Sequence, residues 1–366
     1  MRIGIIDADL LGRKYHAFPN LVCMKLSSYW KSRNAEVVMK TDYEHLEEYD
    51  KVYIAKVFTD TAIPAEVLDR TNVEYGGTGF FYDQAVPLPY EIEHSQPDYE
   101  FYSRWLTEQP YTQYTKQKYY REYSIGYLTR GCCRHCSFCV NRASNKSQKH
   151  SPLKEFLEPT REKICLLDDN FLASSEWKEL LIELKQTGKA FQFKQGLDAR
   201  LLDEEKSGLL FSSKYDGDYI FSYDDARETA VIEEKLKLIR SYTHRSVKFY
   251  VLCGYDREGR YDLEFWKRDM KELFSRIMLL GENRCIPYVM RYARYKESPY
   301  KRLYDVISRW CNNPKFIKTV SLMEFVGNEK NRHKTYQADI ERYVKENEEN
   351  AMYVIERAWK HAAEWG

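Results

Sequence analysis

The chain has 366 residues, which is enough for two domains or for one barrel with appendages. It has 57 Lys and Arg against 56 Asp and Glu, so composition indicates neither a nucleic-acid partner nor an anionic membrane. No run of 18 apolar residues occurs, so no membrane span is expected.

The first ninety residues alternate strand and helix patterns. Strands are predicted over residues 2–6, 35–39, 51–57 and 72–75, with a helix over 20–33. Strands and helices at this spacing indicate an open parallel sheet with helices on its faces. Ligands of such sheets lie beyond the carboxyl ends of the strands, which here are residues 7–19, 58–61 and the glycine turn 76–79. We therefore predict an α/β domain over residues 1–90.

The next segment differs in composition. Residues 83–123 are rich in Pro, Tyr, Gln and Glu and show little periodicity. We interpret them as a linker and wrapping segment, and we set its bounds as a separate part of the chain at 91–123.

Alternation then resumes. Further strands are predicted over residues 124–129, 163–167, 191–195, 219–223, 247–252 and 286–290. Ser174 and Ser175 are expected to cap a helix over 176–186. Six βα units in succession predict a partial (β/α)6 TIM-like barrel over 124–315, with its chemistry at the carboxyl ends of the strands. A charged helical extension is expected over 316–366.

The chain has nine cysteines. An acidic residue, Asp7, comes too early in the sequence for a signal peptide. This predicts a cytoplasmic protein with reduced thiols. Five cysteines are scattered and are expected to be buried as small apolar residues. They are Cys23, Cys165, Cys253, Cys285 and Cys311.

The other four cysteines lie in one short loop after a predicted strand. Cys132, Cys136 and Cys139 have the spacing C-x3-C-x2-C, and Cys133 lies between them. Three closely spaced thiolates can bind three irons of a [4Fe–4S] cluster and leave the fourth iron open. This spacing predicts a cluster with these three ligands.

Two other interpretations stay open. A structural zinc site would need a fourth ligand at a regular spacing, and no second C-x2-C or H-x3-H half follows the loop. The chain could also be a binding protein in which zinc or an iron–sulfur cluster serves structure or sensing.

The segment from Gly126 to Val140, GYLTRGCCRHCSFCV, resembles the motif of radical S-adenosylmethionine (radical SAM) enzymes that carry an N-terminal cobalamin-binding-type, Rossmann-like domain. The resemblance implies that the cluster binds SAM at its free iron and cleaves it reductively. A 5′-deoxyadenosyl radical would then abstract hydrogen from the substrate. It also implies that Phe138 lies beside the adenine and that an electron donor such as flavodoxin or ferredoxin is a partner.

Polar residues that follow the later strands lie where this family builds its SAM pocket. The resemblance implies that the turn after the second strand receives the amino group of SAM, that Asp198 binds the ribose and that Arg200 binds the carboxylate. The predicted pocket residues are Asp168, Asp169, Asn170, Gln195, Asp198, Arg200, Ser222 and Arg291.

Cobalamin binding, and with it methyl transfer, stays open. The base-off motif D-x-H-x-x-G is absent, and the glycine turn 76–79 is a weak indication by itself. The sequence does not identify the substrate.

Overall fold

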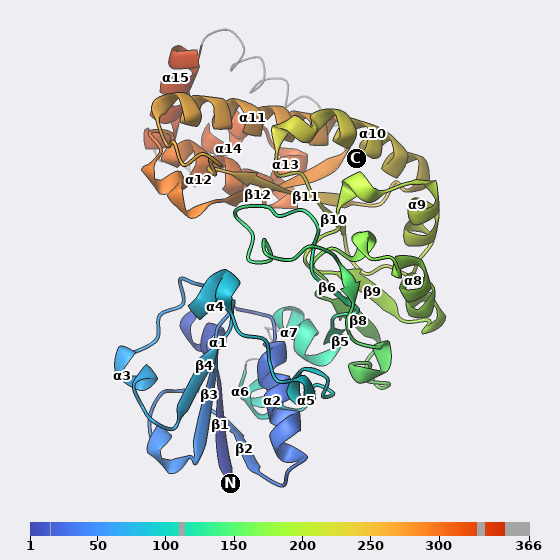
Figure 1. Cartoon of the computed structure of the whole chain (residues 1–366). Helices are drawn as coiled ribbons and strands as arrows, with labels where there is room; N and C mark the ends of the chain where they lie inside the picture. The colour runs from blue at the N-terminus through green and yellow to red at the C-terminus, as the bar shows by residue number, and fades with distance from the viewer. Residues whose placement is uncertain (15, 110–113, 328–333, 348–366) are drawn as a thin grey trace. The chain divides into compact units, whose positions relative to one another are not determined.

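The computed structural model describes residues 1–14, 16–109, 114–327 and 334–347, and the chain divides into two compact units, Met1–Gln192 and Phe193–Gly366 (Figure 1). Both units are of mixed α/β type with parallel sheets, as predicted. The division at Gln192 reflects packing and does not test the predicted bounds at 90, 123 and 315. Within these ranges, every helix is too short or too polar to cross a bilayer.

The first unit begins with an open sheet and its helices. The elements are β1 (Arg2–Asp7), α1 (Ala8–Gly12), α2 (Leu21–Lys31), β2 (Glu36–Met39), η1 (Leu46–Glu48), β3 (Lys51–Ala55), α3 (Ala65–Leu68), β4 (Val73–Gly76), α4 (Thr78–Phe81) and η2 (Tyr82–Gln84). The strand order is β2-β1-β3-β4, and every pair is parallel. The four predicted strands and the predicted helix are therefore confirmed.

The two faces of β1 serve two cores. Ile3 and Ile5 pack on the α2 side of the sheet, whereas Ile6 packs on the other side. This alternation follows from the period of two in a strand. Helix α2 starts where the Asn20 side chain accepts hydrogen bonds from the backbone N–H groups of Val22 and Cys23, at 3.0 and 3.4 Å.

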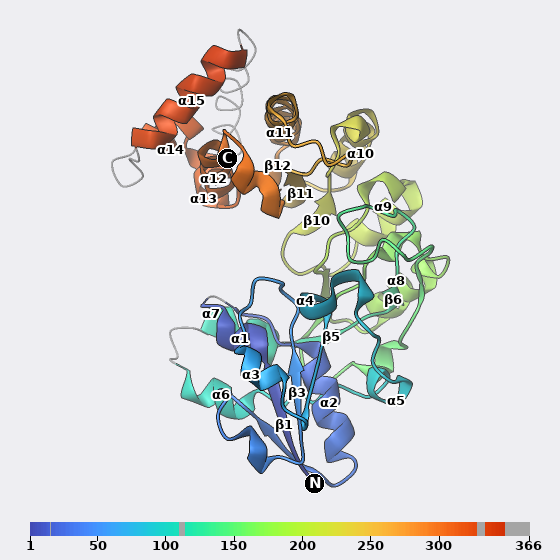
Figure 2. The same cartoon turned by 60° about the vertical axis from the view of Figure 1, so that its left-hand side comes forward.

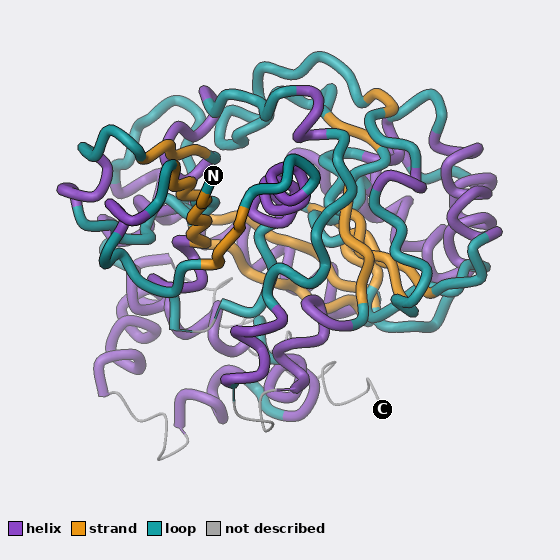
Figure 3. Tube along the Cα trace, turned by 90° about the horizontal axis from the view of Figure 1, so that it is seen from below, coloured by secondary structure: helices purple, strands orange, loops and turns teal. Residues whose placement is uncertain are grey.

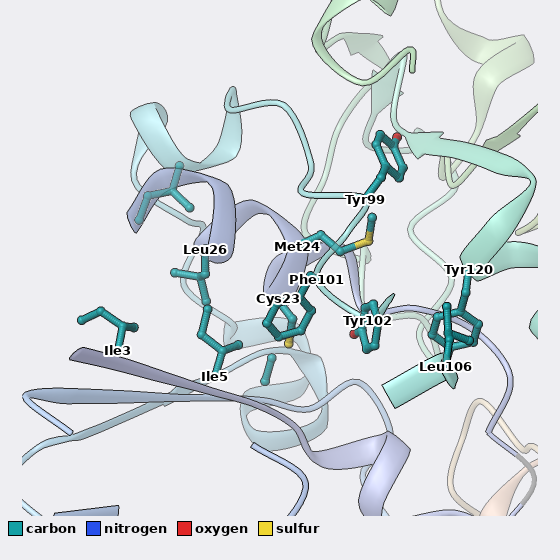
Figure 4. Packing of buried hydrophobic residues seen from close by; sticks show 12 residues of the cluster. Ile3, Ile5, Cys23, Met24, Leu26, Tyr99, Phe101, Tyr102, Leu106 and Tyr120 are labelled. Carbon is teal, nitrogen blue, oxygen red and sulfur yellow. The ribbon is translucent and has the colours of Figure 1, made fainter. Parts of the chain in front are cut away.

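The segment interpreted as a linker contributes to the α2 core. It forms three short helices, α5 (Tyr90–Glu93), α6 (Ser103–Glu108) and α7 (Tyr114–Arg121). Tyr102, Leu106 and Tyr120 belong to the same buried cluster as Cys23 of α2 (Figure 4). The Tyr102 hydroxyl donates to Asp7 Oδ2 at 2.7 Å. The segment is therefore a structural part of the first unit.

The remainder of the first unit holds a second parallel sheet and a small hairpin. The elements are β5 (Tyr123–Gly126), β6 (Thr129–Arg130), β7 (Gln148–Lys149), η4 (Leu153–Glu155), β8 (Lys163–Leu166), η5 (Phe171–Ala173), α8 (Trp177–Gln186) and β9 (Ala190–Phe193). The sheet order is β5-β8-β9, and β6 pairs with β7 in antiparallel fashion. The prediction that Ser174 or Ser175 caps α8 is wrong, because Glu176 is the N-cap and both hydroxyls donate to its carboxylate.

The second unit is built on the parallel sheet β10-β11-β12. Its elements are η6 (Ala199–Leu201), α9 (Glu204–Phe211), β10 (Tyr219–Ser222), η7 (Ala226–Glu228), α10 (Thr229–Tyr242), β11 (Val247–Cys253), α11 (Leu263–Glu282), β12 (Cys285–Arg291), η8 (Ala293–Glu297), α12 (Lys301–Cys311), α13 (Pro314–Thr319), α14 (Leu322–Gly327) and α15 (Lys334–Asn347). Leu197 forms a parallel bridge with Phe221 at the β10 edge. Helix α11 packs on β11 and β12, and α12 packs on β12 (Figure 2).

All six strands that the sequence predicts after residue 123 are present, in two parallel three-stranded sheets. Figure 3 shows how short most of the strands are and how much of the chain runs as loop between them. The expected C-terminal extension is helical through α15, and its part from residue 348 onward lies outside the described residues.

Candidate functional site

The cysteine loop lies between β6 and β7, so an antiparallel pair of two-residue strands closes its base. Cys132, Cys136 and Cys139 are each partly exposed, and Cys133 is exposed. The five scattered cysteines are all buried, as predicted. Burial raises the thiol pKa of the four whose shift is resolved, which are Cys23, Cys253, Cys285 and Cys311. The thiols that chemistry could reach are therefore those of the loop.

Two positive φ angles shape this loop. Gly131 has φ +93°, and a Cβ atom there would lie 2.3 Å from the Lys146 carbonyl oxygen, so only glycine fits. His135 has φ +49°, and its Nδ1 lies 2.9 Å from the Arg142 carbonyl oxygen. The Cys139 N–H donates to the Cys136 carbonyl at 2.9 Å, which turns the chain between these two thiols. The loop is thus turned in part by contacts among its own residues.

Asp168 fixes the chain before the loop. Its carboxyl group accepts hydrogen bonds from the Leu128 N–H at 3.2 Å, the Thr129 N–H at 2.6 Å and the Thr129 hydroxyl at 2.7 Å. Burial raises the pKa of Asp168 to about 7, against the effect of these three donors. Asp168 was predicted to face SAM, but the structure gives its carboxyl group to the β5–β6 connection.

Asp169 joins the two sides of the cysteine segment within this loop. Its Oδ2 accepts from the Gly131 N–H at 2.8 Å, and its Oδ1 accepts from the Asn141 side-chain amide at 2.7 Å. Arg130 Nε lies 3.8 Å from the same carboxylate. One acidic side chain from the end of β8 therefore bridges residues on either side of the three cysteines.

Two N–H groups point at loop sulfurs. The Asn170 side-chain amide lies 3.4 Å from Cys132 Sγ, and the Asn141 backbone N–H lies 3.4 Å from Cys139 Sγ. N–H groups stabilise thiolate ligands of an iron–sulfur cluster, so the chemistry of this donor set fits one. Within the described part of the chain, no three His, Cys, Asp or Glu side chains are placed as a ready metal-binding group. The fit therefore rests on the spacing and on these donors.

Phe138 lies in the same loop and is partly exposed. Its carbonyl oxygen accepts a hydrogen bond from the Tyr82 hydroxyl, and Arg142 forms an ion pair with Asp83 at 2.6 Å. The structure therefore anchors the far side of the loop to the segment that follows α4. The predicted contact of Phe138 with adenine stays a prediction.

The other predicted site residues belong to the second unit. Asp198 is 5% exposed and caps η6, and its Oδ1 accepts from Arg200 Nε at 2.6 Å. Arg200 also forms an ion pair with Glu228. Two carboxylates thus already hold the guanidinium that was predicted to bind the SAM carboxylate.

The remaining three predicted positions differ in exposure. Gln195 is exposed, Ser222 ends β10 and is partly buried, and Arg291 pairs with Asp305 of α12. The Arg291 guanidinium also lies over the Tyr295 ring, 4.6 Å from its centroid. The structure therefore directs Arg291 toward its own unit's helix and η8.

Sequence reasoning missed Asn141 and Ser144. Asn141 joins Asp169 to the loop, and the Ser144 hydroxyl accepts from the Cys132 N–H at 3.1 Å. Their only signal in the sequence is an amide two residues and a hydroxyl five residues after Cys139, which any turn could supply.

Comparisons with known proteins add no further constraint. No family model matches the chain, and no curated protein matches it. The site is therefore described by its own geometry, which is three partly exposed cysteines in a loop shaped by a glycine. Asp169 binds residues on either side of the three cysteines, and Asn170 contacts one of the sulfurs.

Proposed function

We propose that the chain is a radical SAM enzyme whose [4Fe–4S] cluster is bound by Cys132, Cys136 and Cys139. The observation that carries this proposal is the loop itself. Among the nine cysteines, these three combine cluster spacing with partial exposure, and two of their sulfurs face N–H donors. A cluster bound there supplies the electron that cleaves SAM to methionine and a 5′-deoxyadenosyl radical.

The chain's own residues supply the positioning. Asp169 holds residues on either side of the three cysteines, and Asp168 fixes the backbone that leads into the loop. Because Cys133 is exposed at a position outside the C-x3-C-x2-C spacing, it is not assigned as a ligand. Preorganised ligands lower the entropy lost when the cluster binds.

The fold supports the same proposal at a coarser level. Polar residues follow β8 in the first unit, and Ser222 ends β10 in the second, which is compatible with the predicted partial (β/α)6 barrel. The N-terminal sheet with order β2-β1-β3-β4 is compatible with a cobalamin-binding-type domain. We propose the barrel on this basis and leave cobalamin and methyl transfer as an option of the same chemistry.

The charge of the loop suits an acidic electron donor such as flavodoxin or ferredoxin. From Thr129 to Lys154 the sequence has six Lys or Arg and no Asp or Glu, although the whole chain is close to neutral. Two of the six, Arg130 and Arg142, pair with Asp169 and Asp83 from other segments. A cationic surface attracts an acidic partner and speeds its association. Reduced thiols and such a donor are both typical of the cytoplasm, where we place the protein.

The second candidate is a zinc-stabilised or iron–sulfur protein that uses the loop for structure or sensing. Anaerobic reconstitution with iron and sulfide, followed by dithionite and SAM, separates the candidates. The proposal predicts 5′-deoxyadenosine from the wild type and none from Cys136→Ala. A fully loaded cluster that forms no 5′-deoxyadenosine would favour sensing, and uptake of zinc in place of iron would favour structure.

A further inference from the structure

Asn170 lacks the hydrogen bond that is usual for an asparagine at its position. It is the N-cap residue of η5, yet its side chain makes no capping hydrogen bond there. Asparagine at an N-cap ordinarily accepts from the first backbone N–H groups of the helix. Here the side-chain amide lies 3.4 Å from Cys132 Sγ, and the residue is 3% exposed. The Asn170 side chain therefore does not cap η5, and its N–H group faces the sulfur of Cys132.

The position of this amide is fixed by its neighbours. Asp168 and Asp169, the two residues before Asn170, are bound to Thr129 and Gly131, which precede Cys132. The turn after β8 and the start of the loop are therefore joined at consecutive residues. The N–H···S contact needs no reorganisation when the charge on the sulfur changes.

A fixed N–H group beside a cluster ligand affects the oxidised and reduced states unequally. Reduction adds negative charge that is shared with the thiolate sulfurs, and a nearby N–H group stabilises that charge. On the Asn170 side the donor is shielded from water, because that residue is 3% exposed, whereas Cys132 itself is partly exposed. Removing the donor should therefore favour the oxidised cluster.

We infer that Asn170 is a positioning residue that raises the reduction potential of the cluster through its hydrogen bond to Cys132. This inference rests on the proposed function and gives Asn170 a role distinct from the SAM contact that the sequence suggested. The proposed role of Asn170 concerns reduction of the cluster, before any substrate is bound.

The test is a redox titration of the reconstituted full chain without SAM. The EPR signal of the reduced cluster monitors the titration and gives the reduction potential. Asn170→Leu keeps a side chain branched at Cγ but removes the donor. It should lower the equilibrium constant for reduction roughly tenfold, which is a shift of about 59 mV for one electron. Asn141→Leu is the matched control, because it loosens the same loop but keeps the backbone N–H that faces Cys139.

The control should change that equilibrium less than about twofold. An unshifted potential in a fully loaded Asn170→Leu protein would overturn the inference, as would an equal shift in Asn141→Leu. If Asn170→Leu binds no iron, Asn170→Asp replaces it, and its negative charge should move the potential in the same direction. Loss of the cluster from both variants would also overturn the inference, whereas a wild type that takes up no iron would overturn the proposed function itself.

Discussion

Asp169 provides the sharpest test of how the cysteine loop is held. Its carboxylate accepts the Gly131 N–H at 2.8 Å and the Asn141 side-chain amide at 2.7 Å. In Asp169→Ala both bonds are lost, and the partly buried Gly131 N–H has no acceptor from this side chain. A hydrogen bond to a charged group contributes about 1.5 kcal/mol, so the variant should destabilise the closed loop by about 3 kcal/mol.

Amide hydrogen exchange, followed by mass spectrometry, measures this directly. Because 1.4 kcal/mol corresponds to a factor of about ten, exchange over residues 131–142 should quicken by about 100-fold in Asp169→Ala. Asp83→Asn is the matched control, since it removes the ion pair with Arg142 on the outer side of the loop. An ion pair with a partly exposed Arg contributes at most about 1 kcal/mol, so the control should change exchange by less than about fivefold.

Two results would refute this account of the loop. Unchanged exchange in Asp169→Ala would mean that the backbone turns hold the loop without the carboxylate. An equal effect from Asp83→Asn would mean that loss of any contact releases it. Exchange across α2 should stay unchanged in both variants, which shows that the first unit remains folded.

Three further predictions concern the first unit. Gly126→Ala should lower the free energy of unfolding by about 2–3 kcal/mol, because the new Cβ would lie 2.3 Å from the Phe156 ring; urea denaturation measures this. Tyr102→Phe should lower it by about 2 kcal/mol, because the buried Asp7 carboxylate loses a donor at 2.7 Å. Burial lowers the pKa of His150 to about 4, so the folded state resists protonation and stability falls as pH drops from about 6.5 toward 4. Relative to His150→Phe, the wild type should lose about 2 kcal/mol between pH 7.5 and pH 5.

A different result would contradict each of these three predictions. A Cβ at Gly76 would meet nothing within 4 Å, so Gly76→Ala should be tolerated, and equal losses at both glycines would argue against the Phe156 clash. Full stability of Tyr102→Phe would mean that Asp7 does not depend on the hydroxyl. An identical pH dependence in the wild type and His150→Phe would remove His150 as the source of acid sensitivity.

The strands were predicted well from the sequence, because their residues are buried in a regular pattern. In β1, Ile3, Ile5 and Ile6 divide between two cores, so the apolar pattern marks a strand buried on both faces. The helices between residues 90 and 121 were not predicted. They are short and are held by packing of aromatic residues such as Tyr102 and Tyr120 into the α2 core, which carries no regular period.

The candidate site was predicted in part for a similar reason. The spacing of Cys132, Cys136 and Cys139 marked the loop without help from structure. The contacts of Asp169 and Asn170 with that loop join residues 38 positions apart, and no local pattern encodes such a distance. The sequence therefore pointed to the polar turn after β8, but we expected that turn to bind SAM. In the structure the turn binds the cysteine loop.

Iron and sulfide analysis of single cysteine variants tests the central claim most directly. After anaerobic reconstitution, the wild type and Cys133→Ala should each bind four irons and four sulfides per chain and give the EPR signal of a reduced [4Fe–4S] cluster. Cys132→Ala, Cys136→Ala and Cys139→Ala should each lose it. Full iron content in any of these three, or loss of the cluster only in Cys133→Ala, would contradict the assignment of the ligands.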